Sequence, residues 1–159
     1  MAGSVERVRA HLESLGLEVE FREFEVSTKS SALAAQALGC SVAEIAKSVV
    51  FKGKRPVVVV ISGDKRVDPS KLWSHEGAPV AIATPDEVRE MTGYPIGGVP
   101  PFPHSGEVAV LVDSSVLRFD RVWAAGGAPN AVFNVKTVDL ARTVGGRPVD
   151  LASASRGQT

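Results

Sequence analysis

The chain has 159 residues, of which 44% are hydrophobic and 23% charged, and its formal net charge is zero. This size and composition suit one soluble globular domain with its own core, and no apolar run reaches the length of a membrane span. Zero net charge argues against a broad nucleic-acid-binding surface, so any RNA contact should be local. The single cysteine, Cys40, excludes an internal disulfide and fits a cytoplasmic location.

Helices and strands are expected to alternate irregularly along the chain. A helix capped by Ser4 comes first, and Ser41 begins a capping box for a short helix that ends near Lys47. The continuous apolar run 57–61 is typical of a buried strand, which forms a hairpin with residues 49–51. The other expected strands are 17–21, 79–83, 108–112, 120–124 and 131–135, and the other expected helices are 32–38, 69–73, 85–92 and 137–141.

The order of these elements predicts the fold class. Hairpins that recur without regular strand–helix alternation favour an α/β fold with a mixed, mostly antiparallel sheet surrounded by short helices. We expect a single compact domain over residues 1–152. The small polar residues 153–159 are expected to form a flexible tail.

The stretch 94–104 combines four prolines with Gly97 and Gly98 and carries no charge before His104. Glycines allow a ligand to approach the bare backbone, whereas prolines stiffen a loop and remove N–H donors. A stiff loop with a few exposed amides can hold a carbonyl or phosphate oxygen. The alternative is a rigid connection between a helix and a strand.

The common catalytic motifs are absent from the sequence. It has no phosphate-binding glycine motif and no nucleophile elbow, and its histidines, His11, His75 and His104, lack metal-ligand spacing. We therefore expect no metal and no cofactor. Any chemistry should depend on positioning, backbone donors and the substrate's own groups.

Five segments, in this order, resemble the YbaK/ProX superfamily, whose members are free-standing relatives of the editing domain inserted in bacterial prolyl-tRNA synthetases. The matching segments are Ala34-Ala35 with Leu38-Gly39, residues 45–51, Ser62-Gly63-Asp64, residues 92–102, and Asp113 with Ala125-Gly126 and Asp139-Leu140. The resemblance implies a compact α/β domain around a mixed, barrel-like sheet. It also implies hydrolysis of the ester between a wrong amino acid and tRNA.

The same resemblance implies a site. The family's lysine corresponds to Lys47, which would neutralise the phosphate of the terminal adenosine or orient the ester. The family's loop glycines correspond to Gly97 and Gly98, which are expected to be catalytic with Lys47 by directing amides at the scissile carbonyl. The expected substrate-binding residues are Thr28, Pro101, Phe102 and Asn130. Pro100 and Pro103 depart from the family loop, and Pro100 removes a hydroxyl and an amide.

Some polar residues leave alternatives open. Asp113 is interpreted as a turn residue at a strand end, and Asn130 as either a pocket group or a turn former. The basic residues that flank the apolar strand are either an RNA-binding face or solvated turn charges: Lys52, Lys54, Arg55, Lys65 and Arg66.

The leading hypothesis is a trans-acting aminoacyl-tRNA deacylase, an aminoacyl-tRNA hydrolase that acts in translation quality control on the tRNA for proline or a related tRNA. Its partner would be the tRNA acceptor end with its aminoacyl-adenosine. An aminoacyl-tRNA synthetase is an optional further partner, and no membrane is expected. The alternative is a non-catalytic module that uses the same pocket for a nucleotide, an aminoacyl-tRNA end or a protein partner.

Overall fold

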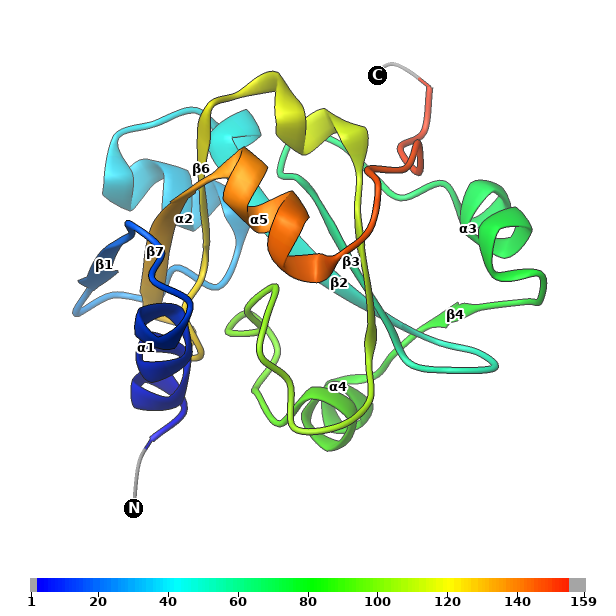
Figure 1. The fold of residues 1–159 in the computed structure, drawn as a ribbon, viewed down its shortest axis with the longest axis horizontal. Helices are drawn as coiled ribbons and strands as arrows, with labels where there is room; N and C mark the ends of the chain where they lie inside the picture. Colours follow the sequence, from blue (N-terminus) through cyan, green and yellow to red (C-terminus); the bar gives the residue numbers. More distant parts are fainter. Residues whose placement is uncertain (1–2, 155–159) are drawn as a thin grey trace.

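The computed structural model describes residues 3–154, which form one seven-stranded sheet with short helices around it (Figure 1). The elements, in chain order, are α1 (Ser4–Ser14), β1 (Glu20–Glu23), α2 (Ser31–Leu38), the 3-10 helix η1 (Val42–Glu44), β2 (Ile45–Lys52), β3 (Val57–Ser62), α3 (Pro69–Glu76), β4 (Ala81–Ile82), α4 (Pro85–Thr92), β5 (Ala109–Val112), the 3-10 helix η2 (Ser114–Arg118), β6 (Arg121–Ala125), β7 (Ala131–Lys136) and α5 (Thr137–Val144).

The sheet is mixed and mostly antiparallel, which confirms the predicted fold class. Its strand order is β1-β7-β6-β2-β3-β5, with β4 paired to β2. Among the named strands of residues 3–154, only the β2–β6 and β3–β5 pairings are parallel. The sheet does not close into the expected barrel, because β1 and β5 remain separate edges. The β5 edge is covered instead by Val149, whose N–H donates to the Val112 carbonyl at 2.9 Å.

The hairpin of β2 and β3 forms the centre of the domain. Every residue of β3 is buried, as the continuous apolar run predicts. Val58 and Val60 face a large core that includes residues of α1, α4 and α5, whereas Val57, Val59 and Ile61 face a smaller core with Leu72 of α3. Both faces of β3 are therefore covered, so polar residues near it lie in low-dielectric surroundings.

The observed boundaries of helices and strands correct three expectations. The N-cap of α1 is Gly3 rather than Ser4, and β1 begins at Glu20, later than the alternation after Leu17 predicts. The Ser41 capping box closes only the single turn of η1, because the carbonyl of Ile45 already accepts from Gly63 N–H at 2.7 Å. Lys47 consequently lies inside β2 and not at a helix–strand junction.

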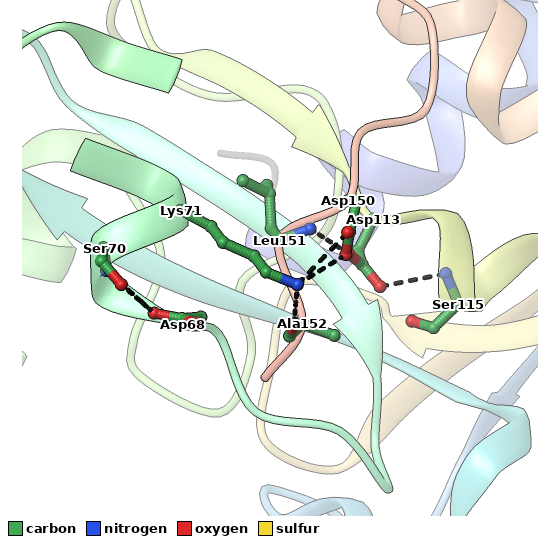
Figure 2. Close-up of polar contacts among 8 residues, drawn as sticks. All are labelled: Asp68, Ser70, Lys71, Asp113, Ser115, Asp150, Leu151 and Ala152. Atoms are coloured by element: carbon green, nitrogen blue, oxygen red, sulfur yellow. Dashed lines mark hydrogen bonds and ion pairs between the residues drawn. The ribbon is translucent and has the colours of Figure 1, made fainter. Parts of the chain in front are cut away.

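Asp113 is buried at the end of β5 and fastens the C-terminal segment to the sheet (Figure 2). Its carboxylate accepts from the N–H groups of Ser115 at 2.9 Å and Leu151 at 2.7 Å. Lys71 donates to the carbonyl of Ala152 at 2.7 Å in the same region. Asp113 is therefore a structural residue, in agreement with its interpretation as a turn residue.

We predict that Asp113→Ala lowers the free energy of unfolding by about 2–5 kcal/mol, because two buried N–H groups lose their acceptor. Asp150→Ala is the matched control, since Asp150 is exposed and, among the described residues, pairs only with Lys71, at 3.1 Å. Urea unfolding of both variants measures the difference. Equal stability of the two variants would contradict a fastening role for Asp113.

Of the expected tail, only Ser153 and Ala154 are described, and Ser153 N–H donates to the Arg66 carbonyl at 2.8 Å. The remaining residues, 155–159, lie outside the described part of the chain. None of the helices within residues 3–154 has the length and apolar character needed to cross a bilayer.

Candidate active site

A gap in the sheet determines where the candidate site lies. β2 pairs with β6 only at Ile45 and Ala46, and with β4 only at Phe51 and Lys52. Between these pairings, no strand of the described part of the chain lies beside residues 47–50 on that edge. The loop that follows α4 lies between the β6–β7 side and the β2–β3 side of the molecule (Figure 1).

A cavity of about 430 Å³ occupies this gap. Its walls come from the segment before α2 and from α2, from β2, from the ends of β4 and β6, from α4 and from the loop after α4. The lining residues are Thr28, Lys29, Ser30, Ser31, Ala34, Ile45, Ala46, Lys47, Ser48, Val49, Val50, Gly63, Ile82, Ala83, Val88, Ile96, Gly97, Val99, Trp123, Ala124, Ala125 and Val132.

Alternation along β2 gives the cavity two different ends. Lys47 shares a face of the strand with Ile45, which packs against α2. Ser48 shares the opposite face with Ala46 and Val50, which belong to the large core. The cavity therefore extends from a polar end near α2 to an apolar end inside the core.

Lys47 is the cationic group of the β2 edge. Its Nζ donates to the Gly63 carbonyl at 3.5 Å. The nearby Asp64 carboxylate forms an ion pair with Arg118 at 2.7 Å. Burial lowers the pKa of Lys47, the charge of Arg66 lowers it further, and Asp64 partly opposes them. Within residues 3–154 no carboxylate forms an ion pair with Lys47. Its amino group is thus open to an anionic or polar ligand.

Gly97 brings its backbone to the cavity wall. Its φ of +84° lies in the left-handed region, and a Cβ atom there would lie 2.5 Å from Lys29 Cβ. Among the described residues, no hydrogen-bond acceptor pairs with the Gly97 N–H. The structure thus places Lys47 and the loop residue Gly97 on the wall of the same cavity.

Gly98 does not share this arrangement, which corrects the expectation of two amides directed at a substrate. Its N–H donates to the Pro95 carbonyl at 2.9 Å, and its own carbonyl accepts from Gly127 N–H at 3.0 Å. A Cβ atom at Gly98 would lie 2.8 Å from the Ala128 Cα. Gly98 therefore holds the two glycine-containing loops together and is not among the cavity-lining residues.

The expected substrate-binding residues are dispersed. Thr28 lines the cavity, but its hydroxyl and its N–H both donate to the Pro129 carbonyl, at 3.2 and 2.6 Å. The Asn130 side chain donates to the Phe24 carbonyl at 2.8 Å and lies outside the lining. Asn130 thus acts as a loop former, one of its two interpretations.

Pro101 and Phe102 belong to the core rather than to the cavity lining. The Phe102 ring lies 6.0 Å from the His11 ring, measured between centroids. His104 braces the loop from within, because its Nε2 lies 2.9 Å from the Pro100 carbonyl. Burial lowers the pKa of His104, which favours the neutral ring in this position.

Comparison with known proteins agrees with this geometry. The aminoacyl-tRNA editing domain family model matches residues 25–143. The chain belongs to the aminoacyl-tRNA editing domain family. The predicted resemblance is therefore confirmed.

Several individual proteins are similar over most of this editing domain. The uncharacterized protein YwhH of Bacillus subtilis (strain 168) is 34% identical, over 86% of this chain and 88% of that protein. The multifunctional Ser/Thr-tRNA deacylase ProXp-y of Escherichia coli (strain K12) is 30% identical, over 79% of this chain and 82% of its own. A crystal structure of a candidate trans-editing enzyme for prolyl tRNA synthetase superposes with a TM-score of 0.87 and is 39% identical, covering 97% of this chain and 99% of that one.

The departures of this editing domain from the family loop lie away from the cavity. Pro100 is buried and is not among the lining residues, so its missing amide and hydroxyl remove no donor from the cavity wall. Four lining residues with polar side chains are not among the predicted site residues: Lys29, Ser30, Ser31 and Ser48. If the strand had been predicted to begin at Ile45, alternation along it would have placed Ser48 on the face opposite Lys47.

The lining also limits the chemistry available to the editing domain. It contains no His, Cys, Asp or Glu side chain. Within residues 3–154 no group of three or more such side chains could hold a metal ion. What the cavity wall offers a substrate is the amino groups of Lys29 and Lys47, the backbone of the loop after α4 and several hydroxyls.

Proposed function

We propose that this protein is a trans-acting aminoacyl-tRNA deacylase that hydrolyses the ester of a mischarged tRNA. The observation that carries the proposal is a cavity lined by Lys47 and by Gly97, whose N–H has no partner among the described residues, in a member of the editing domain family. The proposed ligand is the acceptor end of the tRNA, with its terminal aminoacyl-adenosine. The structural relative described for prolyl tRNA synthetase makes the tRNA for proline the first one to test.

The proposed reaction uses the cavity to stabilise charge. Attack on the ester carbonyl places negative charge on its oxygen, and the Gly97 N–H and the Lys47 amino group can both stabilise it. Because no histidine or carboxylate lines the cavity, the neighbouring ribose hydroxyl would accept the proton of the attacking water and pass its own proton to the ribose oxygen that leaves, which gives the free amino acid and the deacylated tRNA. The protein's contribution is then orientation and electrostatic stabilisation rather than covalent chemistry.

A panel of mischarged tRNAs tests the proposal directly. The wild-type protein is incubated with each aminoacyl-tRNA, and the remaining ester is measured against spontaneous hydrolysis. We expect at least one member to be hydrolysed well above the spontaneous rate. Hydrolysis of none, with retained binding of a non-hydrolysable aminoacyl-adenosine analogue, would favour the non-catalytic module.

We also predict a shallow salt dependence of tRNA binding. Two of the basic residues that flank the apolar strand β3 form ion pairs. Lys52 pairs with Glu87 at 2.8 Å, and Arg55 pairs with Glu76 at 2.8 Å. The cations left near the cavity are Lys29, Lys47 and Arg66, so few phosphates can be neutralised at once.

Three such contacts predict a slope of about −2 to −3 for log K against log salt. Filter binding or anisotropy between low and moderate salt measures it. A Lys54→Ala variant, altered at an exposed turn residue, should leave the slope unchanged. A slope steeper than about −6 would reveal a larger basic face and contradict the prediction.

A further inference from the structure

We propose that the open edge of β2 binds the aminoacyl group of the substrate as if that group were one residue of a further strand. The Ser48 carbonyl accepts a hydrogen bond from the α-amino group, and the Ser48 N–H donates to the ester carbonyl. The inference deepens the proposed function and rests on it, since the ligand is the acceptor end of an aminoacyl-tRNA. It concerns how the α-amino group is recognised, not which amino acid side chain is preferred.

The cavity runs along one edge of β2. Six consecutive residues of the strand, 45–50, line it. Because neighbouring residues of a strand point to opposite faces, a cavity on one face would touch only every second residue. The unbroken run therefore places the cavity beside the main chain. The opposite edge is paired with β3 from Ala46 to Phe51, so the cavity lies on the edge that β2 shares with β6 and β4.

The main chain of Ser48 points toward this edge. In an antiparallel pair, the N–H and C=O groups of successive residues point to opposite edges. The Ile45 carbonyl accepts from Gly63 N–H at 2.7 Å, which directs the odd-numbered residues of β2 toward β3. The Val50 carbonyl accepts from Ala83 N–H at 3.0 Å, which directs the even-numbered residues the other way. The N–H and C=O of Ser48 consequently face the cavity, where no described strand pairs with them.

The accessible surface of β2 is centred on the same residue. Lys47, Ser48 and Val49 are partly exposed, whereas residues 45–46 and 50–51 on either side of them are buried. The Ser48 Oγ is itself buried, so the accessible atoms of this residue belong to its main chain and Cβ. A ligand in the cavity can therefore reach the main chain of Ser48.

An aminoacyl group matches the two main-chain groups of Ser48. In a hydrogen-bonded antiparallel pair, each residue donates through its N–H and accepts through its C=O. An aminoacyl ester carries its amino nitrogen and its carbonyl on one α-carbon, as a strand residue does. The cavity lining has no carboxylate for the amino group, and a main-chain carbonyl is the acceptor that the edge provides. The ester oxygen has two lone pairs, so a bond from Ser48 N–H leaves one for Lys47 or Gly97.

The first test compares alanyl- and propionyl-adenosine analogues in which an amide replaces the ester. The two differ only in the α-amino group, and neither is hydrolysed. We expect calorimetry to show that the wild-type protein binds the alanyl analogue about tenfold more tightly, the effect of one hydrogen bond of about 1.4 kcal/mol. Equal affinities, or no binding of either analogue, would overturn the inference. A preference supports it even if no aminoacyl-tRNA is hydrolysed, a result that would count against the proposed function alone.

The second test is Ser48→Pro, which ties binding to the β2 edge. Proline removes the N–H and places a methylene group at the edge. The fold should tolerate the change, because this N–H faces no partner strand among the described residues. We expect the variant to bind the alanyl analogue at least tenfold more weakly. Unchanged binding by the variant, with a wild-type circular dichroism spectrum, would overturn the inference; if the variant does not fold, the analogue pair decides.

Glu23→Pro is the matched control for the proline. The Phe24 N–H donates to the Asn130 carbonyl in β7's direction, so the N–H of the preceding residue, Glu23, points to the free edge of β1. Glu23 is exposed and does not line the cavity. The control places the same residue on another unpaired strand edge and should bind the alanyl analogue as the wild type does.

Discussion

Replacement of Lys47 by methionine should lower the rate of deacylation by about 100-fold or more, because a group that stabilises developing charge is lost. Methionine retains the apolar stem of the lysine and removes the amino group from the cavity. The fold should be unaffected, since Lys47 forms no ion pair within residues 3–154 and its one hydrogen bond there, to the Gly63 carbonyl, is long at 3.5 Å. Single-turnover deacylation and thermal unfolding measure the two effects.

Lys54→Met is the matched control for this prediction. Lys54 is exposed in the turn between β2 and β3 and does not line the cavity. The control should deacylate at the wild-type rate. If Lys47→Met also does so while melting like the wild type, Lys47 has no part in the reaction.

The second large effect is expected for Gly97→Ala. The new Cβ would lie 2.5 Å from Lys29 Cβ and 3.1 Å from Lys29 Cα, so either the loop or the segment before α2 must shift. Both segments line the cavity, and the shift would move the unpaired Gly97 N–H. We expect deacylation to fall by about 100-fold, which is the typical effect of losing one donor to an oxyanion.

Gly145→Ala separates this effect from backbone strain. Gly145 follows α5 with a φ of +77°, close to the +84° of Gly97, but a Cβ there would meet nothing within 4 Å. Both variants carry a similar strain of about 1–2 kcal/mol, whereas only Gly97→Ala alters the cavity. Similar deacylation by the two variants would show that the Gly97 position is structural only.

Gly98→Ala is a poor substitute in this experiment, although the sequence makes the two glycines look equivalent. Its Cβ would meet the backbone of Ala128, so the variant would separate two loops and reduce stability as well as activity. The distinction matters for interpretation, because a loss of activity in Gly98→Ala could not be attributed to a missing amide.

Local sequence signals determined much of the fold. The capping box at Thr84 and the cap and proline at Asp68-Pro69 start α4 and α3 as predicted, and the glycines at 39 and 93 end α2 and α4. These signals succeed because caps satisfy backbone groups within one turn of the chain. The apolar run of β3 was equally clear, since burial on both faces requires it.

The cavity was decided only by the tertiary structure. The cavity exists because β2 stops pairing with β6 after Ala46 and begins to pair with β4 at Phe51. These pairings join segments that are distant in the chain. The same long-range packing pairs the Gly98 amide, leaves that of Gly97 unpaired and isolates the Ser48 hydroxyl. The resemblance to the family identified Lys47, and residue composition identified the loop, but which of their neighbours face a ligand depends on contacts that local periodicity does not encode.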